Sequence, residues 1–248
     1  MAKQRLLIHG SSWTVGAYKK SSTPNSDTLV KGGLAELLSD DYDVTNISVQ
    51  DNMNLGIWIG LREHLKHDSR YDKIIICQND PLMDFGIWRN DDDGWLSQFP
   101  YSKKDLVDGN IDSISKMICY FLTMFYGKVS ETVGDIPTYI IGGPSRLNIG
   151  LMNKYGLKSV GADWMQTLVP SYNPSYLESG TELDYATQWL IANFPQNEGK
   201  LKFEFIEFVE ELNYKLEMYR GNPDLFAYHH PTAKGNALYY NIVKDGLK

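Results

Sequence analysis

The sequence predicts an α/β protein: a three-layer α/β/α sandwich with a central parallel sheet. Two observations predict this class. Short apolar runs alternate with longer segments of helical periodicity, and glycine or polar residues follow the ends of the apolar runs. Strands that alternate with helices form parallel sheets, and their carboxyl ends lie at one edge where ligands bind. The composition, 42% hydrophobic and 22% charged, is ordinary for a folded globular chain.

Four apolar runs predict the strands, and each is short enough to be one. The first, RLLIH at 5–9, ends abruptly at a glycine, and DVTNISV at 43–49 alternates apolar and polar residues. The others, DKIIIC at 72–77 and PTYIIGG at 137–143, are almost wholly apolar. Such runs are typical of parallel strands that are covered on both faces.

Five longer segments predict helices, at residues 27–39, 55–67, 110–129, 201–219 and 232–246. In the first, DTLVKGGLAELLS, four leucines fall on one helical face. The fourth, LKFEFIEFVEELNYKLEMY, is strongly amphipathic. The last follows a His-Pro pair, and proline suits the first turn of a helix.

We expect one domain over residues 1–248, interrupted by two insertions. Residues 84–103 and 148–200 combine polar, glycine and aromatic residues with weak periodicity. Both insertions are expected at the carboxyl-end side of the sheet. The acidic run Asp91-Asp92-Asp93 lacks the ligand spacing of an EF-hand, which favours a solvated turn over a calcium site.

Charge and hydropathy exclude several classes of partner. The net charge of −7, without clusters of lysine and arginine, argues against nucleic-acid binding. No stretch approaches the ~20 apolar residues of a membrane span, and the first ten residues hold too short an apolar run for a secretory signal. We therefore expect a cytoplasmic protein, with release by another route left open. Cys77 and Cys119 lie in apolar runs and are expected to be buried thiols.

Residues that could perform chemistry follow predicted strands or precede the last helix. Ser12 follows the first strand, Asn79 follows the strand IIIC, and His230-Pro231 precedes the final helix. A serine at such a turn either caps the helix or acts as a nucleophile with a nearby base. An asparagine there is either a turn residue or a donor to an oxyanion.

In order and placement, these segments resemble the sequence blocks of the SGNH, or GDSL-like, hydrolase family. GSSWTVG at 10–16 matches four positions of the first block, Gly-Asp-Ser-Leu/Ile-Thr-x-Gly. Asn79-Asp80 matches the end of Gly-x-Asn-Asp, and HPTAKG at 230–235 matches the His-Pro pair and glycine of the last block. The resemblance spans the chain from residue 5 to its end, apart from the two insertions.

The resemblance implies a flavodoxin-like SGNH fold and a serine ester hydrolase that needs neither a cofactor nor a metal. Ser12 would attack the ester carbonyl, and His230 would act as the base. The backbone N–H of Ser12, the amide of Asn79 and a backbone N–H near Asp51 would hold the oxyanion.

Three positions depart from the family pattern. Ser11 stands where the family has aspartate, and Asp51 stands near the expected glycine of the second block. Ala227 replaces the acid three residues before the histidine, so Asp224 becomes the candidate third member of a catalytic triad. A backbone carbonyl that orients the imidazole, or a Ser-His dyad, is the alternative.

The substrate suggested by the resemblance is an acyl ester, such as an acetyl ester, of a small molecule or a carbohydrate. Tryptophan rings can stack on sugars, and Trp13 beside Ser12 is the first candidate; buried tryptophans are the alternative explanation. The other tryptophans considered are Trp58, Trp88, Trp95 and Trp164. A non-catalytic SGNH-like binding or structural module is the alternative function, favoured by the missing acid and glycine. A phosphate-binding loop is excluded because GSSWTVG lacks the P-loop lysine.

Overall fold

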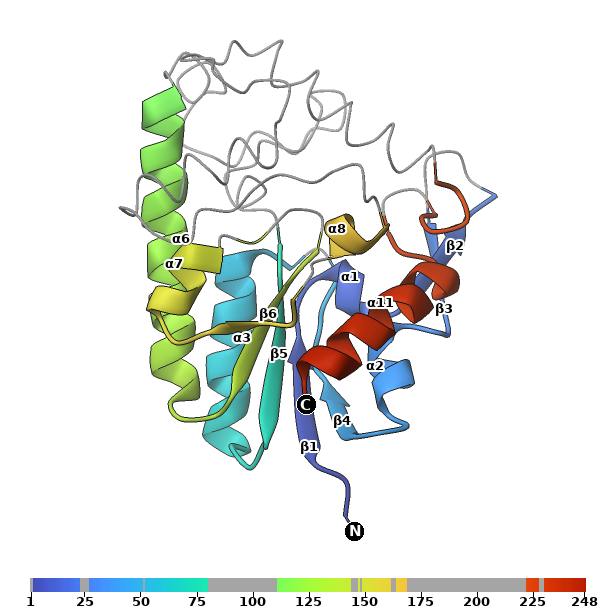
Figure 1. The fold of residues 1–248 in the computed structure, drawn as a ribbon, viewed down its shortest axis with the longest axis horizontal. Helices are drawn as coiled ribbons and strands as arrows, with labels where there is room; N and C mark the ends of the chain where they lie inside the picture. Colours follow the sequence, from blue (N-terminus) through green and yellow to red (C-terminus); the bar gives the residue numbers. More distant parts are fainter. Residues whose placement is uncertain are drawn as a thin grey trace.

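The fold is built around a five-stranded parallel sheet, shown in Figure 1 in a computed structural model of the chain. The structure describes residues 2–22, 27–50, 52–79, 111–143, 147, 149–161, 164–168, 222–227 and 230–248. The sheet has the order β4-β1-β5-β6-β7, and every neighbouring pair is parallel. Counted along the chain within this sheet, the order is the flavodoxin-like 2-1-3-4-5. The predicted fold class is confirmed.

The strands of this sheet are short, and the three central ones are mostly buried, whereas the two edge strands contain no buried residue. They are β1 (Arg5–His9), β4 (Asp43–Asn46), β5 (Lys73–Gln78), β6 (Thr138–Gly142) and β7 (Lys158–Ser159). The first four lie within the predicted apolar runs or one residue beyond them. β6 is buried at every position because helices cover both faces of the sheet, which explains its continuous apolar sequence.

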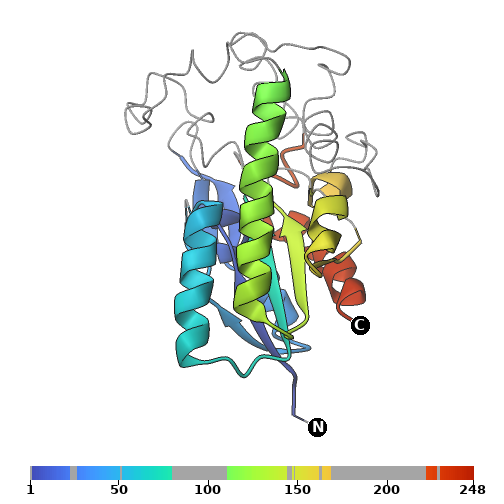
Figure 2. The same ribbon diagram turned by 90° about the vertical axis from the view of Figure 1, so that its left-hand side faces the viewer.

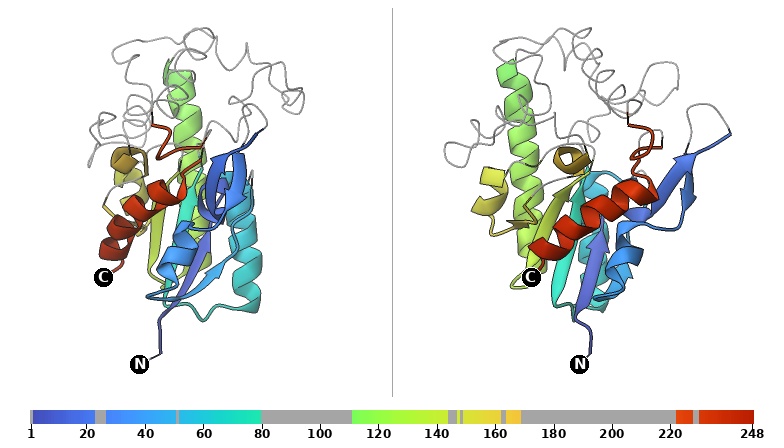
Figure 3. Two further views of the ribbon diagram at one scale, coloured as in Figure 1. Left: turned by 90° about the vertical axis from the view of Figure 1, so that its right-hand side faces the viewer. Right: turned by 45° about the vertical axis from the view of Figure 1, so that its right-hand side comes forward.

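Two layers of helices cover the sheet, as Figures 2 and 3 show from opposite sides. One layer comprises α3 (Asn54–His67), α6 (Ile111–Val133) and α7 (Ile149–Lys154). The other comprises α2 (Leu34–Leu38), α8 (Trp164–Leu168) and α11 (Ala233–Gly246).

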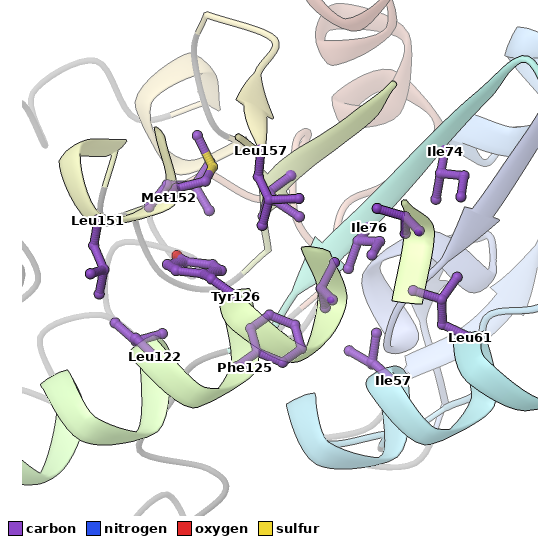
Figure 4. Packing of buried hydrophobic residues seen from close by; sticks show 14 of the residues in the cluster. Ile57, Leu61, Ile74, Ile76, Leu122, Phe125, Tyr126, Leu151, Met152 and Leu157 are labelled. Carbon is purple, nitrogen blue, oxygen red and sulfur yellow. The ribbon is translucent and has the colours of Figure 1, made fainter. Parts of the chain in front are cut away.

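Residues along β5 alternate between these two layers. Ile74 and Ile76 face the first layer, whereas Ile75 and Cys77 face the second. Figure 4 shows the first layer, where labelled side chains from α3, α6 and α7 gather against the sheet. Burying each such side chain stabilises the fold by about 1.5–3 kcal/mol. The two cores hold the strand ends in fixed positions, which is what a site at the sheet edge requires.

A two-stranded antiparallel hairpin lies outside the main sheet. It follows α1 (Ser12–Val15) and pairs β2 (Ala17–Lys20) with β3 (Asp27–Val30). Figure 3 shows the hairpin beside the amino-terminal end of α11. The hairpin, which is formed by residues near the start of the chain, therefore lies next to the last helix of the chain.

The prediction of a single helix over residues 27–39 is wrong, because part of this segment belongs to the hairpin. The first four of these residues form β3, and only residues 34–38 are helical. Gly32 adopts φ +95°, which costs energy for any residue with a side chain. A Cβ atom on Gly33 would lie 2.5 Å from the Cα of Gly16. The two glycines therefore end the strand before the helix begins.

The first part of the predicted insertion at 148–200 belongs to the sheet and to the helices that cover it. α7, β7 and α8 all fall inside it, and β7 pairs with β6. The rest of this insertion, the insertion at 84–103 and the predicted helix at 201–219 lie outside the described residues. Among the helices that the structure describes, none is both long and apolar enough to cross a membrane.

Candidate active site

Ser12 stands at the start of α1, just beyond the carboxyl end of β1. The backbone N–H of Thr14 donates to the Ser11 carbonyl at 3.0 Å and closes the turn. Thr14 is held from β4 and the loop after it, because Asn46 Nδ2 donates to its carbonyl at 2.8 Å and Ser48 Oγ donates to its Oγ1 at 2.9 Å. The turn that presents Ser12 is therefore fixed by hydrogen bonds.

Gly10 allows the ends of β1 and β5 to approach closely. A Cβ atom on Gly10 would lie 2.6 Å from the Cβ of Cys77, closer than real Cβ contacts. Ser12 and Asn79 each lie three residues beyond the last registered pair of these two strands. The parallel register therefore carries both residues to the same edge of the sheet.

The imidazole of His230 makes hydrogen bonds through both of its nitrogens. Nε2 lies 2.8 Å from Ser12 Oγ, and Nδ1 lies 2.7 Å from Asp27 Oδ2. An ionised carboxylate can only accept a hydrogen bond, so Nδ1–H donates to Asp27. Nε2 is then left as the acceptor for the Ser12 hydroxyl. A serine, a base and an acid that orients the base are the groups that activate a hydroxyl for attack.

The loop before α11 holds His230 through backbone hydrogen bonds. The N–H of Ala227 donates to the His230 carbonyl at 2.9 Å, and the N–H of Thr232 donates to the Leu225 carbonyl at 2.9 Å. The Thr232 hydroxyl also accepts from the Gly235 N–H at 3.2 Å and so caps α11. The histidine is thus placed by a turn whose two sides are tied together.

Asp27, not Asp224, lies against the histidine. Asp27 is the first residue of β3, and its side chain is only 6% exposed. The Asp224 side chain is 77% exposed and pairs with Lys234 Nζ at 2.8 Å, which lowers the pKa of its carboxyl. The sequence-based choice of Asp224 as the partner of His230 is wrong. Sequence reasoning missed Asp27 because it placed this residue at the start of a helix.

Asn79 is buried, and hydrogen bonds to Asn54 and Asn52 hold it. Its backbone N–H donates to Asn54 Oδ1 at 2.8 Å, and its carbonyl accepts from Asn54 Nδ2 at 3.0 Å. Its side-chain Nδ2 donates to the Asn52 carbonyl at 3.0 Å, which fixes the plane of the amide. Sequence reasoning missed Asn54; its signal is a polar residue at the start of an apolar helix. Asp51 lies outside the described residues.

Trp13 is not the stacking surface that the sequence suggested. Its side chain is 3% exposed, and its ring centroid lies 5.7 Å from that of the buried Trp164. Trp58 is half-buried against the first core layer. Trp88 and Trp95 lie outside the described residues. Trp13 in α1 and Trp164 in α8 therefore belong to the core and present no ring face to a sugar.

His9 lies at the end of β1, close to the site, and is uncharged at neutral pH. Burial lowers its pKa to about 4, because a buried ring loses the hydration that stabilises its charged form. α3 packs so tightly there that a Cβ atom on Gly60 would lie 2.7 Å from His9 Nε2. Among the described residues, no three metal-binding side chains form a group that could hold an ion.

No family model and no curated protein matches this chain. Among solved structures it is similar to a psychrotrophic esterase, EstA, from Pseudoalteromonas sp., at 16% identity over 99% of this chain and 97% of that one, with a TM-score of 0.43. It is similar to an acetyl xylan esterase, AlAXEase, at 11% identity over 98% and 100% of the two chains, with a TM-score of 0.42. It is also similar to a lipase/acylhydrolase from Enterococcus faecalis, at 12% identity over 97% and 93%, with a TM-score of 0.36. At these identities, roles can be assigned only from the geometry of this chain. That geometry defines an α/β protein with a serine, a histidine and an aspartate hydrogen-bonded in series.

Proposed function

We propose that this chain is a serine ester hydrolase of the SGNH type. Ser12 is the nucleophile, His230 the general base and Asp27 the acid that orients it. The observation that carries the proposal is the hydrogen-bonded series, with 2.8 Å from Ser12 Oγ to Nε2 and 2.7 Å from Nδ1 to the carboxylate. The sequence resemblance at Gly10–Gly16 and 230–235 supports the same assignment.

The reaction proceeds in two steps that reuse the same proton path. Ser12 Oγ forms a bond to the ester carbonyl carbon while its proton passes to His230 Nε2. The bond to the leaving alcohol then breaks, and the alcohol takes that proton from Nε2. Water attacks the acyl-serine with His230 again as the base, and the carboxylic acid leaves as Ser12 regains its hydrogen. Asp27 stabilises the imidazolium in both steps.

The negative oxygen of each tetrahedral intermediate needs hydrogen-bond donors. The N–H of Ser12 belongs to the first turn of α1, where N–H groups have no acceptor within the helix. The Asn79 amide, fixed by Asn54 and Asn52, is the second donor, and the N–H near Asp51 is the third. Losing one such donor typically lowers kcat by about 10²- to 10³-fold.

The proposed substrate is an ester of a short acyl group, such as acetyl, on a small alcohol or a carbohydrate. The carbohydrate part rests on the family resemblance, since the buried Trp13 no longer supports it. The alternative of a non-catalytic module drew support from the missing acid before His230. Asp27 supplies a carboxylate from another element and removes that reason.

Hydrolysis of p-nitrophenyl acetate by the purified full chain tests the proposal. Wild type should hydrolyse the ester with saturation kinetics, and Ser12→Ala should lose at least about 10³-fold in kcat/KM. Ser11→Ala is the matched control. The Ser11 hydroxyl is adjacent in sequence but plays no part in the hydrogen-bonded series, so kcat/KM of this variant should stay within a few-fold of wild type. A folded wild type without activity on short-chain esters, or an active Ser12→Ala, contradicts the proposal.

A further inference from the structure

Tyr18 of β2 lies face to face with the imidazole of His230. The two ring centroids are 4.3 Å apart, and the ring planes are inclined by only 24°. The hydroxyl of Tyr18 accepts a hydrogen bond from Gln50 Nε2 at 3.3 Å. Its backbone N–H donates to the Pro231 carbonyl at 3.1 Å. The tyrosine is therefore tied to the histidine loop and held at its far end.

The hairpin that carries Tyr18 also carries Asp27. Tyr18 is registered with Leu29 on β3, and Lys20 is registered with Asp27. One pair of strands thus presents a carboxylate to the edge of the imidazole and an aromatic ring to its face. The titratable side chains that these two strands bring into contact with the ring are Asp27 from β3 and Tyr18 from β2.

The two kinds of contact restrict different motions of the ring. Hydrogen bonds at Nδ1 and Nε2 define a line between Asp27 and Ser12, but the ring can still tilt about that line. A flat surface stacked at 4.3 Å resists the tilt, because dispersion contacts are lost when the planes separate. A tilt about that line moves Nε2 around the serine oxygen, so the Ser12 O–H bond would no longer be aimed at the Nε2 lone pair.

The stacked tyrosine also acts on the charge of the ring. When Nε2 takes the proton of Ser12, the imidazole becomes a cation that lies over an electron-rich aromatic face. Cation–π attraction of ordinary strength corresponds to about a 2- to 30-fold effect on an equilibrium or a rate. The attraction exists only in the protonated form, so it favours the transition state over the resting enzyme.

We propose that Tyr18 is a positioning residue for His230: its ring fixes the tilt of the imidazole and stabilises the imidazolium formed during acylation. The side chain is 2% exposed, so it offers the substrate no contact surface of its own. This inference rests on the proposed esterase function, because it assigns the tyrosine a role in proton transfer from Ser12.

The test compares Tyr18→Leu with Tyr18→Phe in the full chain, using p-nitrophenyl acetate across pH. Tyr18→Phe keeps the ring face and loses the hydroxyl that accepts from Gln50, so kcat/KM should stay within about threefold of wild type. Tyr18→Leu removes the face and should lower kcat about 10-fold with little change in KM. Its pH profile should move to a lower apparent pKa, because the imidazolium loses its aromatic partner.

Lys19→Ala is the matched control, since Lys19 is an exposed neighbour on the same strand and should leave kcat, KM and the pH profile unchanged. If Tyr18→Leu does not fold, pentafluorophenylalanine at position 18 decides the question. This residue keeps the ring shape but reverses the charge distribution of its face. It should lower kcat by at least about threefold relative to Tyr18→Phe.

The outcomes separate this inference from the proposed function. Ser12-dependent hydrolysis with an unchanged rate and pH profile in folded Tyr18→Leu overturns the role of Tyr18 alone. The same holds if the pentafluorophenylalanine variant behaves like Tyr18→Phe. A wild type that shows no Ser12-dependent hydrolysis overturns the esterase proposal and this inference with it.

Discussion

Replacing Asp27 by asparagine tests the assignment that the sequence did not anticipate. The carboxylate is buried and lies 2.7 Å from His230 Nδ1, so the substitution removes one charge from a site shielded from water. The shape of the side chain is almost unchanged. Any loss of activity therefore reports the charge and the hydrogen-bond direction rather than packing.

The expected loss follows from the distance between the two charges. The centres of the carboxylate and of the imidazolium lie roughly 4 Å apart, and an effective dielectric constant of about 20 gives an attraction of about 4 kcal/mol. That energy corresponds to about a 10³-fold loss in rate. If the new amide turns its NH₂ toward Nδ1, Nε2 must carry the proton and can no longer accept one from Ser12, which deepens the loss.

The assay is kcat/KM for p-nitrophenyl acetate, with melting temperature as the check on folding. Asp224→Asn is the matched control: this carboxylate is exposed and paired with Lys234, so its loss should change kcat/KM by less than twofold. A folded Asp27→Asn variant within threefold of wild type would refute the reasoning. A large loss in Asp224→Asn would refute it as well.

Three further predictions concern the frame around the site. His9 takes a proton near its ordinary pKa of 6.5 in the unfolded chain but only near 4 in the folded chain, so the free energy of unfolding should fall by about 3 kcal/mol as pH drops through this window. Urea titrations should show this loss in wild type and not in His9→Gln; equal pH dependence in the two contradicts it. Gly10→Ala should lower the stability by about 1–3 kcal/mol in the same titration, because its Cβ would overlap Cys77, and an unchanged midpoint would contradict this packing. Asn54→Ala removes two hydrogen bonds from the backbone of Asn79, and kcat should fall about 10- to 100-fold with KM little changed. An unchanged kcat in a folded variant would show that Asn54 does not position Asn79 for catalysis.

The parallel sheet was predictable because its signals are local. Runs such as IIIC at 74–77 are apolar throughout since helices cover both faces of the strand, and the alternation of strands with helices indicates parallel pairing. The turn with Ser12 and the loop with His230 were likewise visible as short motifs. Their meeting follows from topology, because both segments lie at one edge of the sheet.

The partner of His230 could not be found by local reasoning. Asp27 lies 203 positions earlier in the chain, on a hairpin whose first strand and connection gave no strong strand signal. Four leucines at helical spacing favoured a helix over 27–39, although the pair Gly32-Gly33 within it indicated a break. The short motif around Ser12 could not predict that Trp13 is buried, because the residues that pack against Trp13 come from α8 and from the loop before α11.

The central claim is that Ser12 is a nucleophile activated by His230. Reaction of the full chain with a fluorophosphonate probe, followed by mass spectrometry of the labelled peptide, tests it most directly, because the probe forms a covalent bond only with an activated hydroxyl. We predict one phosphonyl group on Ser12, no labelling in Ser12→Ala and labelling slowed by orders of magnitude in His230→Ala. Labelling at Ser11, or no labelling of the folded wild type, would contradict the account.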